Sequence, residues 1–461
     1  MAVRTLTTIQ NTDGTPTNTV LLVTDNLNRA EDIKTHLFKL NFLVKDCLFD
    51  GVTLHNAPKL VPTIILLALT DYIEKAPSIV AGLKKHYGSQ DIPVLATLSR
   101  RGDMDMSFLD SVIYPPAHPS QVATRVDSLI RLSAMEQEIM RRITTLKEGF
   151  NIDYTLEESA LSRPFKILFV GKPTPEFMVV INALQEKNVD VVAAFTTFSA
   201  FDYLYEAQFN AVVLNALEDV EPPLTISSTM RKNAKLYHIP TLLLVDGVTF
   251  DQHERAFEKG ARDLIEADAN LEEISGRILE LANYHRIHSQ LKREFSLIGG
   301  DSCVDKASST FNAAFFHSHL QRSCEALSPP DKSLSIIAVK VRPNAPYPVA
   351  PEEFETACAQ VGNMIKNLVR MQDITGRVER DTYLVAFPNE TEISIAPVIE
   401  RISAIVDCAA FSTKVKDAGP FTVELEISAS ELKEGETSKA LAARTLEFRN
   451  NNIYQHKRIT A

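Results

Sequence analysis

The chain of 461 residues has no tryptophan, little glycine and only five, widely scattered cysteines. Its 16 glycines are about half of what an average composition would give. No G-x-x-x-x-G-K or G-x-G-x-x-G loop is present, so the usual phosphate-cradling loops are excluded. No C-x-x-C pair occurs, so neither a disulfide framework nor a zinc site is indicated. We interpret the cysteines as reduced thiols of a cytoplasmic protein: Cys47, Cys303, Cys324, Cys358 and Cys408.

Long apolar runs are absent as well. The longest one, Ile64 to Leu69, is far too short to cross a bilayer, so no membrane span is expected. Residues 1–18 form a polar tail, expected to be disordered, without the apolar core of a secretion signal. The 48 Lys and Arg against 59 Asp and Glu give a formal net charge of −11. This balance argues against nucleic acid as a partner, because nucleic acid rewards a basic surface.

The chain does contain a duplicated pattern, first in residues 19–150 and again in 163–295. Short apolar runs alternate there with amphipathic stretches, which indicates βαβ units around a parallel sheet. The runs are Val20–Val23, Ile64–Leu69 and Pro93–Ala96 in the first block, and Phe165–Val170, Ala211–Leu214 and Thr241–Val245 in the second. Each block closes on apolar residues spaced three and four apart, typical of a long helix. We predict two α/β domains, each followed by a connecting helix whose extension could pack on a partner helix.

The third block, residues 296–461, has a different order of elements. Its pattern predicts a strand, a helix, a hairpin, a second helix and a further strand. These lie at Ser335–Val339, Glu352–Val369, Gly376–Phe387, Ile395–Val406 and Phe421–Ile427. A hairpin in the middle of such a series is typical of an α+β domain with an antiparallel sheet.

The first two blocks resemble receiver domains of response regulators, and Gly260-Ala261-Arg262-Asp263 is the most specific local match. The third block resembles a GGDEF domain, the diguanylate cyclase module. The order is that of PleD/PopA-like response regulators, closest in logic to the catalytically degenerate cyclic di-GMP effectors among them. The resemblance implies an α/β fold with two receiver-like (flavodoxin-like, doubly wound) domains. An α+β GGDEF-like (nucleotidyl-cyclase) domain follows them.

The resemblance also implies positions for receiver phosphorylation, and these are altered. Ala68 and Asn215 stand where the acceptor aspartates are expected, and neither offers a carboxylate nucleophile. The acidic-pair and lysine positions are changed too: Thr24-Asp25 and Tyr114 or Pro115 in the first block, Gly171-Lys172 and Ala267 in the second. We therefore expect pseudo-receivers kept for packing and dimerisation. Phosphorylation of a displaced residue such as Asp71 is the alternative.

The catalytic positions implied by the GGDEF resemblance are mostly lost. The turn that should carry the motif reads Glu379-Arg380-Asp381-Thr382-Tyr383, in which only Asp381 and Tyr383 match. Ala338 takes the place of the first metal-binding aspartate, and Lys340 adds a positive charge nearby. In the guanine-binding segment Asn312 matches, but Ala313-Ala314 replace the usual arginines. A two-metal displacement needs these carboxylates, so we expect no catalytic residues, no metal and no cofactor.

One ligand site of the family does match. Arg370-Met371-Gln372-Asp373 forms an R-x-x-D motif at the expected distance before the turn, and Arg401 matches the secondary arginine. An arginine offers a planar fork to a guanine edge or a phosphate, and an aspartate accepts from guanine N–H groups. Cyclic di-GMP is thus the expected ligand, bound by Arg370, Asp373 and Arg401. The alternative is a surface Arg–Asp pair worth under about 1 kcal/mol.

These observations predict a catalytically inactive GGDEF-family signalling protein that acts as a cyclic di-GMP-binding effector or adaptor. We expect a cytoplasmic homodimer. Its partner is expected to be a protein in a regulatory complex or in a complex at a cell pole, to which the homodimer could be recruited. Two alternatives stay open. One is a ligand-free dimerisation scaffold, and the other is an active diguanylate cyclase with non-standard metal ligands.

Overall fold

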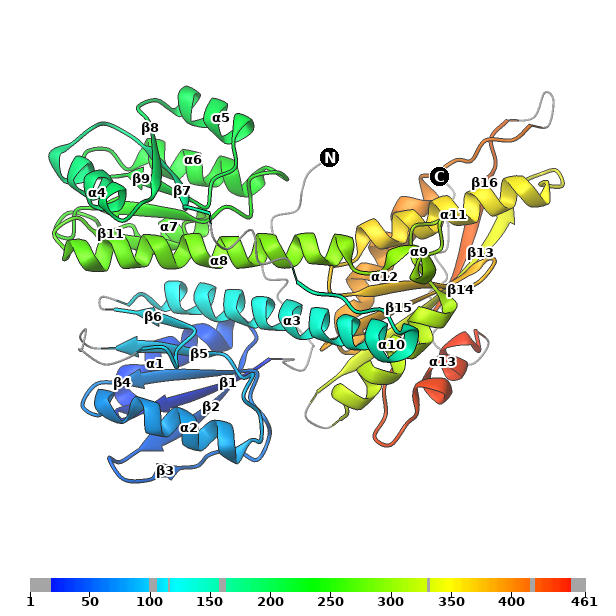
Figure 1. The fold of residues 1–461 in the computed structure, drawn as a ribbon, viewed down its shortest axis with the longest axis horizontal. Helices are drawn as coiled ribbons and strands as arrows, with labels where there is room; N and C mark the ends of the chain where they lie inside the picture. Colours follow the sequence, from blue (N-terminus) through cyan, green and yellow to red (C-terminus); the bar gives the residue numbers. More distant parts are fainter. Residues whose placement is uncertain are drawn as a thin grey trace. The chain divides into compact units, whose positions relative to one another are not determined.

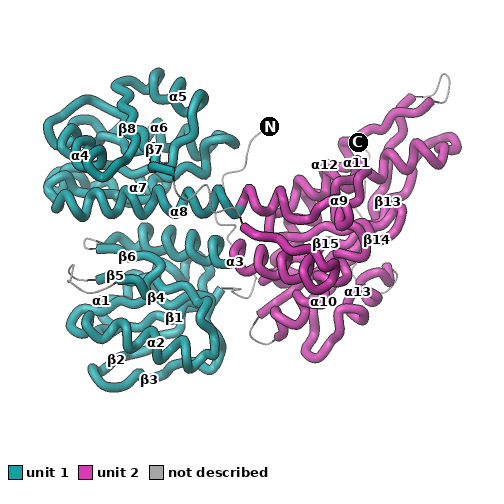
Figure 2. The backbone as a smooth tube through the Cα atoms, in the orientation of Figure 1, with its two compact units in different colours: residues 1–12, 18–133, 157–291 teal, residues 13–17, 134–156, 292–461 magenta. Residues whose placement is uncertain are grey.

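The computed structural model describes residues 18–98, 106–114, 117–156, 163–329, 332–414 and 419–448. Pro115 and nearly all of the predicted tail 1–18 lie outside these residues. The chain divides into two compact units (Figure 2). Unit 1 contains the described residues of 18–133 and 157–291, and unit 2 contains those of 134–156 and 292–461.

The first domain of unit 1 is a doubly wound sheet with the strand order β3-β2-β1-β4-β5-β6 among its described residues. All neighbouring strands are parallel except β2 and β3. Its elements are β1 (Thr19–Thr24), α1 (Leu27–Lys39), β2 (Leu43–Phe49), β3 (Leu54–His55), β4 (Ile64–Leu69), the 3-10 helix η1 (Ile73–Lys75), α2 (Ala76–His86), β5 (Val94–Leu98), β6 (Ser111–Ile113) and α3 (Pro119–Phe150). Helix α2 covers one face of the sheet, and α1 and α3 cover the other. Both faces are therefore buried, which explains why β1 and β4 are apolar at nearly every residue.

The second domain of unit 1 repeats this plan in the described residues. Its strands are all parallel, in the order β11-β10-β9-β7-β8. Its elements are β7 (Lys166–Val170), α4 (Pro175–Glu186), β8 (Asp190–Ala194), α5 (Thr197–Glu206), β9 (Ala211–Asn215), α6 (Glu221–Lys232), β10 (Thr241–Val245), α7 (His253–Glu258), β11 (Asp263–Glu266) and α8 (Leu271–Leu297). Helices α4 and α8 pack on one face, and α5, α6 and α7 on the other. When the two-residue antiparallel strand β3 is left aside, the parallel strands of both domains, counted along the chain, share the 2-1-3-4-5 order of flavodoxin-like folds, so the predicted doubly wound domains are confirmed.

The third domain, in unit 2, is α+β as predicted. Its described residues form one sheet of order β12-β14-β15-β13-β16, with an antiparallel centre. Its elements are α9 (Gly300–Cys303), β12 (Phe311–Asn312), α10 (Ala313–Ala326), β13 (Leu334–Asn344), α11 (Pro351–Leu368), β14 (Ile374–Glu379), β15 (Thr382–Pro388), α12 (Glu392–Asp407), β16 (Thr422–Glu431) and α13 (Ser438–Leu446). Helices α11 and α12 bury their apolar sides together against the sheet. The predicted hairpin is β14–β15, which turns at Arg380-Asp381.

Helices α3 and α8 are the connecting helices that the sequence predicts, with 32 and 27 residues. The predicted domain ends, 150 and 295, lie at or near their last residues, but the division between the compact units falls inside both helices. The second half of α3 belongs to unit 2 because its side chains are buried there, as described below. None of the helices in the described residues combines the length and the apolarity that a membrane crossing requires.

A prediction follows from the packing of α11 on β15. A Cβ added at Gly362 would lie 2.5 Å from ring atoms of Tyr383, which is fully buried and donates a hydrogen bond to the carbonyl of Cys358. We expect Gly362→Ala to lower the free energy of unfolding by about 1–3 kcal/mol through overpacking. Urea unfolding followed by circular dichroism measures this.

The control is Gly276→Ala in α8, where an added Cβ meets nothing within 4 Å. That substitution should leave stability unchanged or raise it by up to about 1 kcal/mol, because alanine favours the helix. Equal losses in the two variants would contradict the packing argument.

Candidate functional site

The surviving carboxylate of the first receiver-like domain supports a loop. Ala68 lies near the end of β4, at the carboxyl edge of the sheet where an acceptor is expected. Beside it, Asp25 Oδ2 accepts hydrogen bonds from three backbone N–H groups of the loop after β4, those of Thr70 (2.8 Å), Asp71 (2.7 Å) and Tyr72 (3.3 Å). Asp71, the displaced alternative acceptor, has an exposed side chain. The carboxylate of Asp25 thus holds the turn that precedes η1.

In the second receiver-like domain, a side-chain amide bridges the loops at the acceptor position. Asn215 ends β9, its Nδ2 donates to the carbonyl of Lys172 at 2.7 Å, and its Oδ1 accepts from the N–H of Leu217 at 3.1 Å. Gly171 has a φ of +136°, and a Cβ there would lie 2.6 Å from the Cβ of Asn215. A carboxylate could not donate to the Lys172 carbonyl, so this contact suits asparagine and not the aspartate of a working receiver.

The Gly-Ala-Arg-Asp segment contributes to the packing of the two receiver-like domains within unit 1. Asp263 is 1% exposed, and its carboxylate accepts from Arg277 Nη2 at 2.5 Å and from Gln121 of α3. Arg125 of α3 lies 3.6 Å from the same carboxylate and 2.5 Å from Glu280 of α8. Tyr284 of α8 also donates to a backbone carbonyl of α3. The specific local match therefore serves a buried ionic interface.

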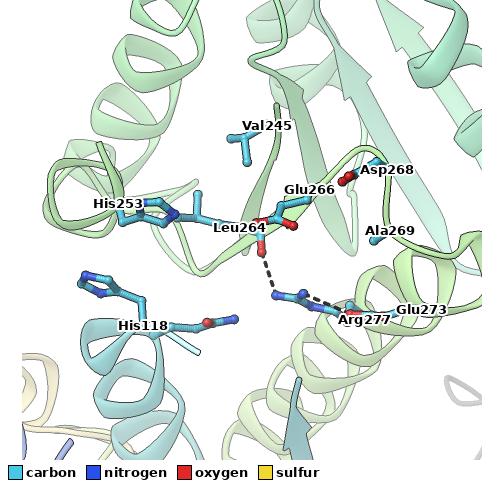
Figure 3. A pocket seen from close by; sticks show the side chains of 10 residues that line it. His118, Val245, His253, Leu264, Glu266, Asp268, Ala269, Glu273 and Arg277 are labelled. Carbon is cyan, nitrogen blue, oxygen red and sulfur yellow. Dashed lines mark hydrogen bonds and ion pairs between the residues drawn. The ribbon is translucent and has the colours of Figure 1, made fainter. Parts of the chain in front are cut away.

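A polar cavity of about 270 Å³ lies next to this interface (Figure 3). Its lining includes His118 and His253, whose rings stack with centroids 5.7 Å apart, and the carboxylates of Glu266 and Glu273. Burial, more than the neighbouring His253, lowers the pKa of His118, which favours the neutral stacked ring. No residue that the sequence singles out as a ligand or catalytic site lines this cavity.

In the third domain, a lysine faces a carboxylate of the β14–β15 turn. Lys340 Nζ lies 4.0 Å from Asp381 Oδ2, and Thr382 donates a hydrogen bond to Asp381 Oδ1. Ala338 is fully buried in β13 and offers no ligand atom. No group of three or more His, Cys, Asp or Glu side chains in the described part of the chain could hold a metal ion. The carboxylate of Asp381 thus has the Lys340 ammonium as its neighbour.

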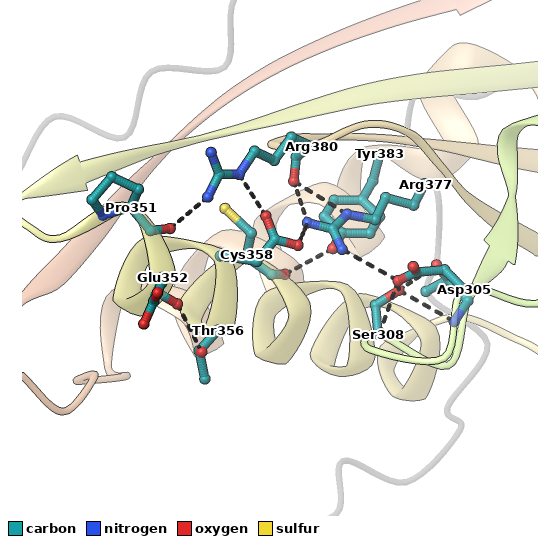
Figure 4. A network of polar contacts seen from close by, with 11 residues as sticks. Asp305, Ser308, Pro351, Glu352, Thr356, Cys358, Arg377, Arg380 and Tyr383 are labelled. Carbon is teal, nitrogen blue, oxygen red and sulfur yellow. Dashed lines mark hydrogen bonds and ion pairs between the residues drawn. The ribbon is translucent and has the colours of Figure 1, made fainter.

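A network of charged side chains lies beneath the same turn (Figure 4). Arg377 is mostly buried, contacts Asp305 at 3.3 Å and Glu355 at 2.6 Å, and donates to the carbonyl of Arg380. Arg380 in turn donates to Glu355 at 2.6 Å and to the carbonyl of Pro351 at 2.6 Å. Burial would raise the pKa of Glu355, but the hydrogen bonds from the two arginines outweigh it and lower that pKa. The arginines are thereby engaged by the domain's own carboxylates.

Asn312, the matching residue of the guanine-binding segment, also has a structural partner at each end. Its Oδ1 accepts from the N–H of Phe315 at 2.9 Å as the N-cap of α10, and its Nδ2 donates to the carbonyl of Ser302 at 2.7 Å.

Arg370 of the R-x-x-D loop and Arg401 of α12 are both exposed. The Arg370 side chain is 60% exposed and forms an ion pair with Glu390. Arg401, exposed on α12, donates from Nη2 to the carbonyl of Leu368 at 2.6 Å, two residues before Arg370. The structure therefore brings together the two predicted arginines.

Asp373, the third predicted ligand residue, points inward. Its side chain is buried, and Oδ2 accepts from the backbone N–H of Arg370 at 2.7 Å, while Oδ1 is buried and has no hydrogen-bond partner among the described residues. Burial raises the pKa of Asp373 to about 7, an effect that the nearby Arg370 only partly offsets. In this conformation the carboxyl group shapes the loop and is not presented to a ligand.

Sequence reasoning missed the residues that hold this loop from the other side. Arg142 of α3 donates from Nη2 to the carbonyls of Met371 and Asp373, both at 3.1 Å. Glu138, four residues earlier on α3, accepts from Arg142 Nε at 2.7 Å. The sequence does contain a signal for them. Glu138 and Arg142 are opposite charges at i, i+4 within the apolar stripe that ends at Leu146, a pattern that indicates an ion pair on the packed face of the helix.

Comparisons with known proteins found no matching family model and no matching curated protein. Among solved structures, the GGDEF domain of FimX from Pseudomonas aeruginosa matches at 12% identity over 31% of this chain and 89% of that one, with a TM-score of 0.28. The GGDEF domain of DgcB from Caulobacter crescentus, in complex with cyclic di-GMP, matches at 16% identity over 32% and 84%, with a TM-score of 0.27. A response regulator from Chloroflexus aurantiacus matches at 18% identity over 26% and 99%, with a TM-score of 0.25. The strand orders described above carry the fold assignment.

The buried carboxyl group of Asp373 predicts a pH-dependent stability. Its folded pKa lies above the ordinary value of 3.8, so its ionisation destabilises the fold progressively from about pH 4 until about pH 7. We expect Asp373→Asn, which can still accept from the Arg370 N–H, to gain stability relative to the original protein as the pH rises. The gain between about pH 5 and pH 8 should be roughly 2–3 kcal/mol in urea unfolding.

The matched control is Asp301→Asn in the same unit, since the side chain of Asp301 is 92% exposed. Its stability difference from the original protein should stay constant with pH. An Asp373→Asn curve that runs parallel to that of the original protein would show that Asp373 titrates normally.

Proposed function

We propose that this protein is a catalytically inactive GGDEF-family signalling protein that binds cyclic di-GMP at the R-x-x-D loop. The observation that supports this most is that exposed Arg401 of α12 donates to the carbonyl of Leu368, two residues before the exposed Arg370. Guanidinium groups are planar donor forks suited to guanine edges and phosphates, both of which cyclic di-GMP offers.

Within this proposal Asp373 acts on the loop and not on the ligand. Its carboxyl group bonds the backbone N–H of Arg370 and so fixes the position from which the arginine side chain projects. The ligand has to displace Glu390 from Arg370. An ion pair with so exposed an arginine contributes little, under about 1 kcal/mol, so a phosphate or a guanine can replace that partner.

The loss of catalysis is supported by the side chains at the catalytic positions. A two-metal mechanism needs carboxylates around the cations, whereas Ala338 has none and Lys340 faces Asp381. The arginine–carboxylate network under the turn adds to this, because Glu355 is already engaged by Arg377 and Arg380.

The receiver-like domains serve packing and dimerisation in this proposal. Ala68 cannot accept a phosphoryl group, and Asn215 has a structural use for its amide. The active form is then a cytoplasmic homodimer whose ligand state changes the surface presented to a protein partner, in a regulatory complex or at a cell pole.

Calorimetric titration of the full-length protein with cyclic di-GMP tests the ligand. We expect micromolar or tighter binding, and a loss of roughly 10-fold to 100-fold in affinity for Arg370→Ala, because charge-assisted hydrogen bonds are removed. GTP serves as the control ligand and should give no comparable heat.

The matched control variant is Arg342→Ala, which removes a half-exposed arginine paired with a glutamate on β13 and β16 of the same unit. Its affinity should equal that of the original protein. A folded original protein that releases no heat with cyclic di-GMP would instead favour the ligand-free scaffold.

A cyclase assay tests the catalytic part of the proposal. Incubation with GTP and Mg²⁺ should yield no cyclic di-GMP above the level given by Asp381→Asn, as measured by chromatography of the nucleotides. Product that forms with the original protein and disappears with Asp381→Asn would establish an active cyclase with non-standard ligands.

A further inference from the structure

The last turns of α3 support the R-x-x-D loop from its buried side. Arg142 is 3% exposed, and its Nη2 donates to the carbonyls of Met371 and Asp373 at 3.1 Å each. These two carbonyls belong to the second and fourth residues of the four-residue motif, on either side of Gln372. The loop therefore takes two of its hydrogen bonds from a helix that lies 229 residues away in sequence.

The Arg142 guanidinium is held in one orientation by aromatic rings. Its Cζ lies 4.7 Å from the ring centroid of Phe295 and 5.5 Å from that of Phe311. A planar guanidinium can rest against these rings while Nε donates to Glu138 and Nη2 donates to both carbonyls, whereas a lysine has one nitrogen and cannot occupy both places.

A buried carboxylate completes the support. Glu138 is fully buried and contacts Arg142 at 2.7 Å, Arg141 at 3.0 Å and His319 of α10 at 3.1 Å. Burial would raise the pKa of Glu138, but His319 and Arg142 outweigh it and lower that pKa, so the group stays ionised. His319 also contacts Thr145 of α3 through Nδ1, at 3.1 Å, which places α3 beside α10 (Figure 1).

We propose that Arg142 is a positioning residue for cyclic di-GMP: it fixes the loop that presents Arg370, so that ligand affinity depends on the placement of α3. The inference rests on the proposed function, and Arg142 itself does not touch the ligand. Helix α3 begins at Pro119, in the first receiver-like domain. A shift of this helix therefore changes the hydrogen bonds to the carbonyls of Met371 and Asp373. Through them it changes the position of the Arg370 side chain.

Arg142→Lys in the full-length protein tests the inference with two measurements. The lysine keeps the positive charge, but its single nitrogen cannot bond Glu138 and reach the two carbonyls at the same time, as Nε and Nη2 of Arg142 do. We expect an affinity for cyclic di-GMP about 10-fold weaker by calorimetry. We also expect faster hydrogen exchange in the peptide that contains residues 370–373, with exchange in β15 and α12 unchanged.

The matched control is Arg322→Lys. Arg322 of α10 pairs with Glu148 of α3 at 2.7 Å, so it joins the same two helices, and within the described ranges it forms no hydrogen bond or ion pair with the loop. Both measurements should match those of the original protein. A loss of affinity in this control equal to that in Arg142→Lys would reduce Arg142 to a general packing role and overturn the inference.

A second variant, Glu138→Gln, covers the case in which Arg142→Lys does not fold. It removes the charge that orients Arg142, and it should move affinity and loop exchange in the same direction. Unchanged affinity and exchange in the folded variants overturn the inference. If the original protein binds no cyclic di-GMP, the proposed function fails by itself, and loop exchange alone then decides whether Arg142 holds the loop.

Discussion

The charged side chains that are buried along α3 need ion-pair or hydrogen-bond partners. This requirement determines which surfaces the helix packs against in each unit. Removing a charged group from water is costly unless an opposite charge or a set of hydrogen bonds replaces the water. In unit 1, Arg125 meets Glu280 and Asp263 of the second receiver-like domain. In unit 2, Arg142 and Glu138 meet His319 and the carbonyls of the R-x-x-D loop. An apolar stripe alone would pack on many surfaces, whereas these ion pairs specify the partner.

The same principle applies to the charged side chains around the β14–β15 turn. The third domain balances these charges internally. Lys340 faces Asp381, and Arg377 and Arg380 engage Glu355. The sheet is kept by apolar packing that does not depend on the site, as the buried Tyr383 between β15 and α11 illustrates. The packing of the sheet is thus independent of the charged side chains at the turn, in line with the general rule that function lies in the site and not in the fold.

The proposed ligand site differs from the β14–β15 turn, because its two arginines are exposed to solvent. Arg370 and Arg401 remain exposed, and the loop that carries Arg370 is shaped by Asp373 from within and by Arg142 from α3. The proposed binding surface is therefore small, but its support reaches into the helix that follows the first receiver-like domain. Such an arrangement makes the site sensitive to the connecting helix without any contact between that helix and the ligand.

The sequence by itself determined the three domains and their strands. Runs such as Ile64–Leu69 and Thr241–Val245 mark strands buried on both faces, and the pattern before and after Arg380-Asp381 marks the hairpin, because neighbours along the chain carry these signals. It also predicted Arg370 and Arg401 as ligand residues. Only the tertiary structure decided that Asp373 turns inward and that Arg142 holds its loop. These contacts join residues up to 231 positions apart, and burial depends on the elements that pack around a side chain. No local pattern encodes either.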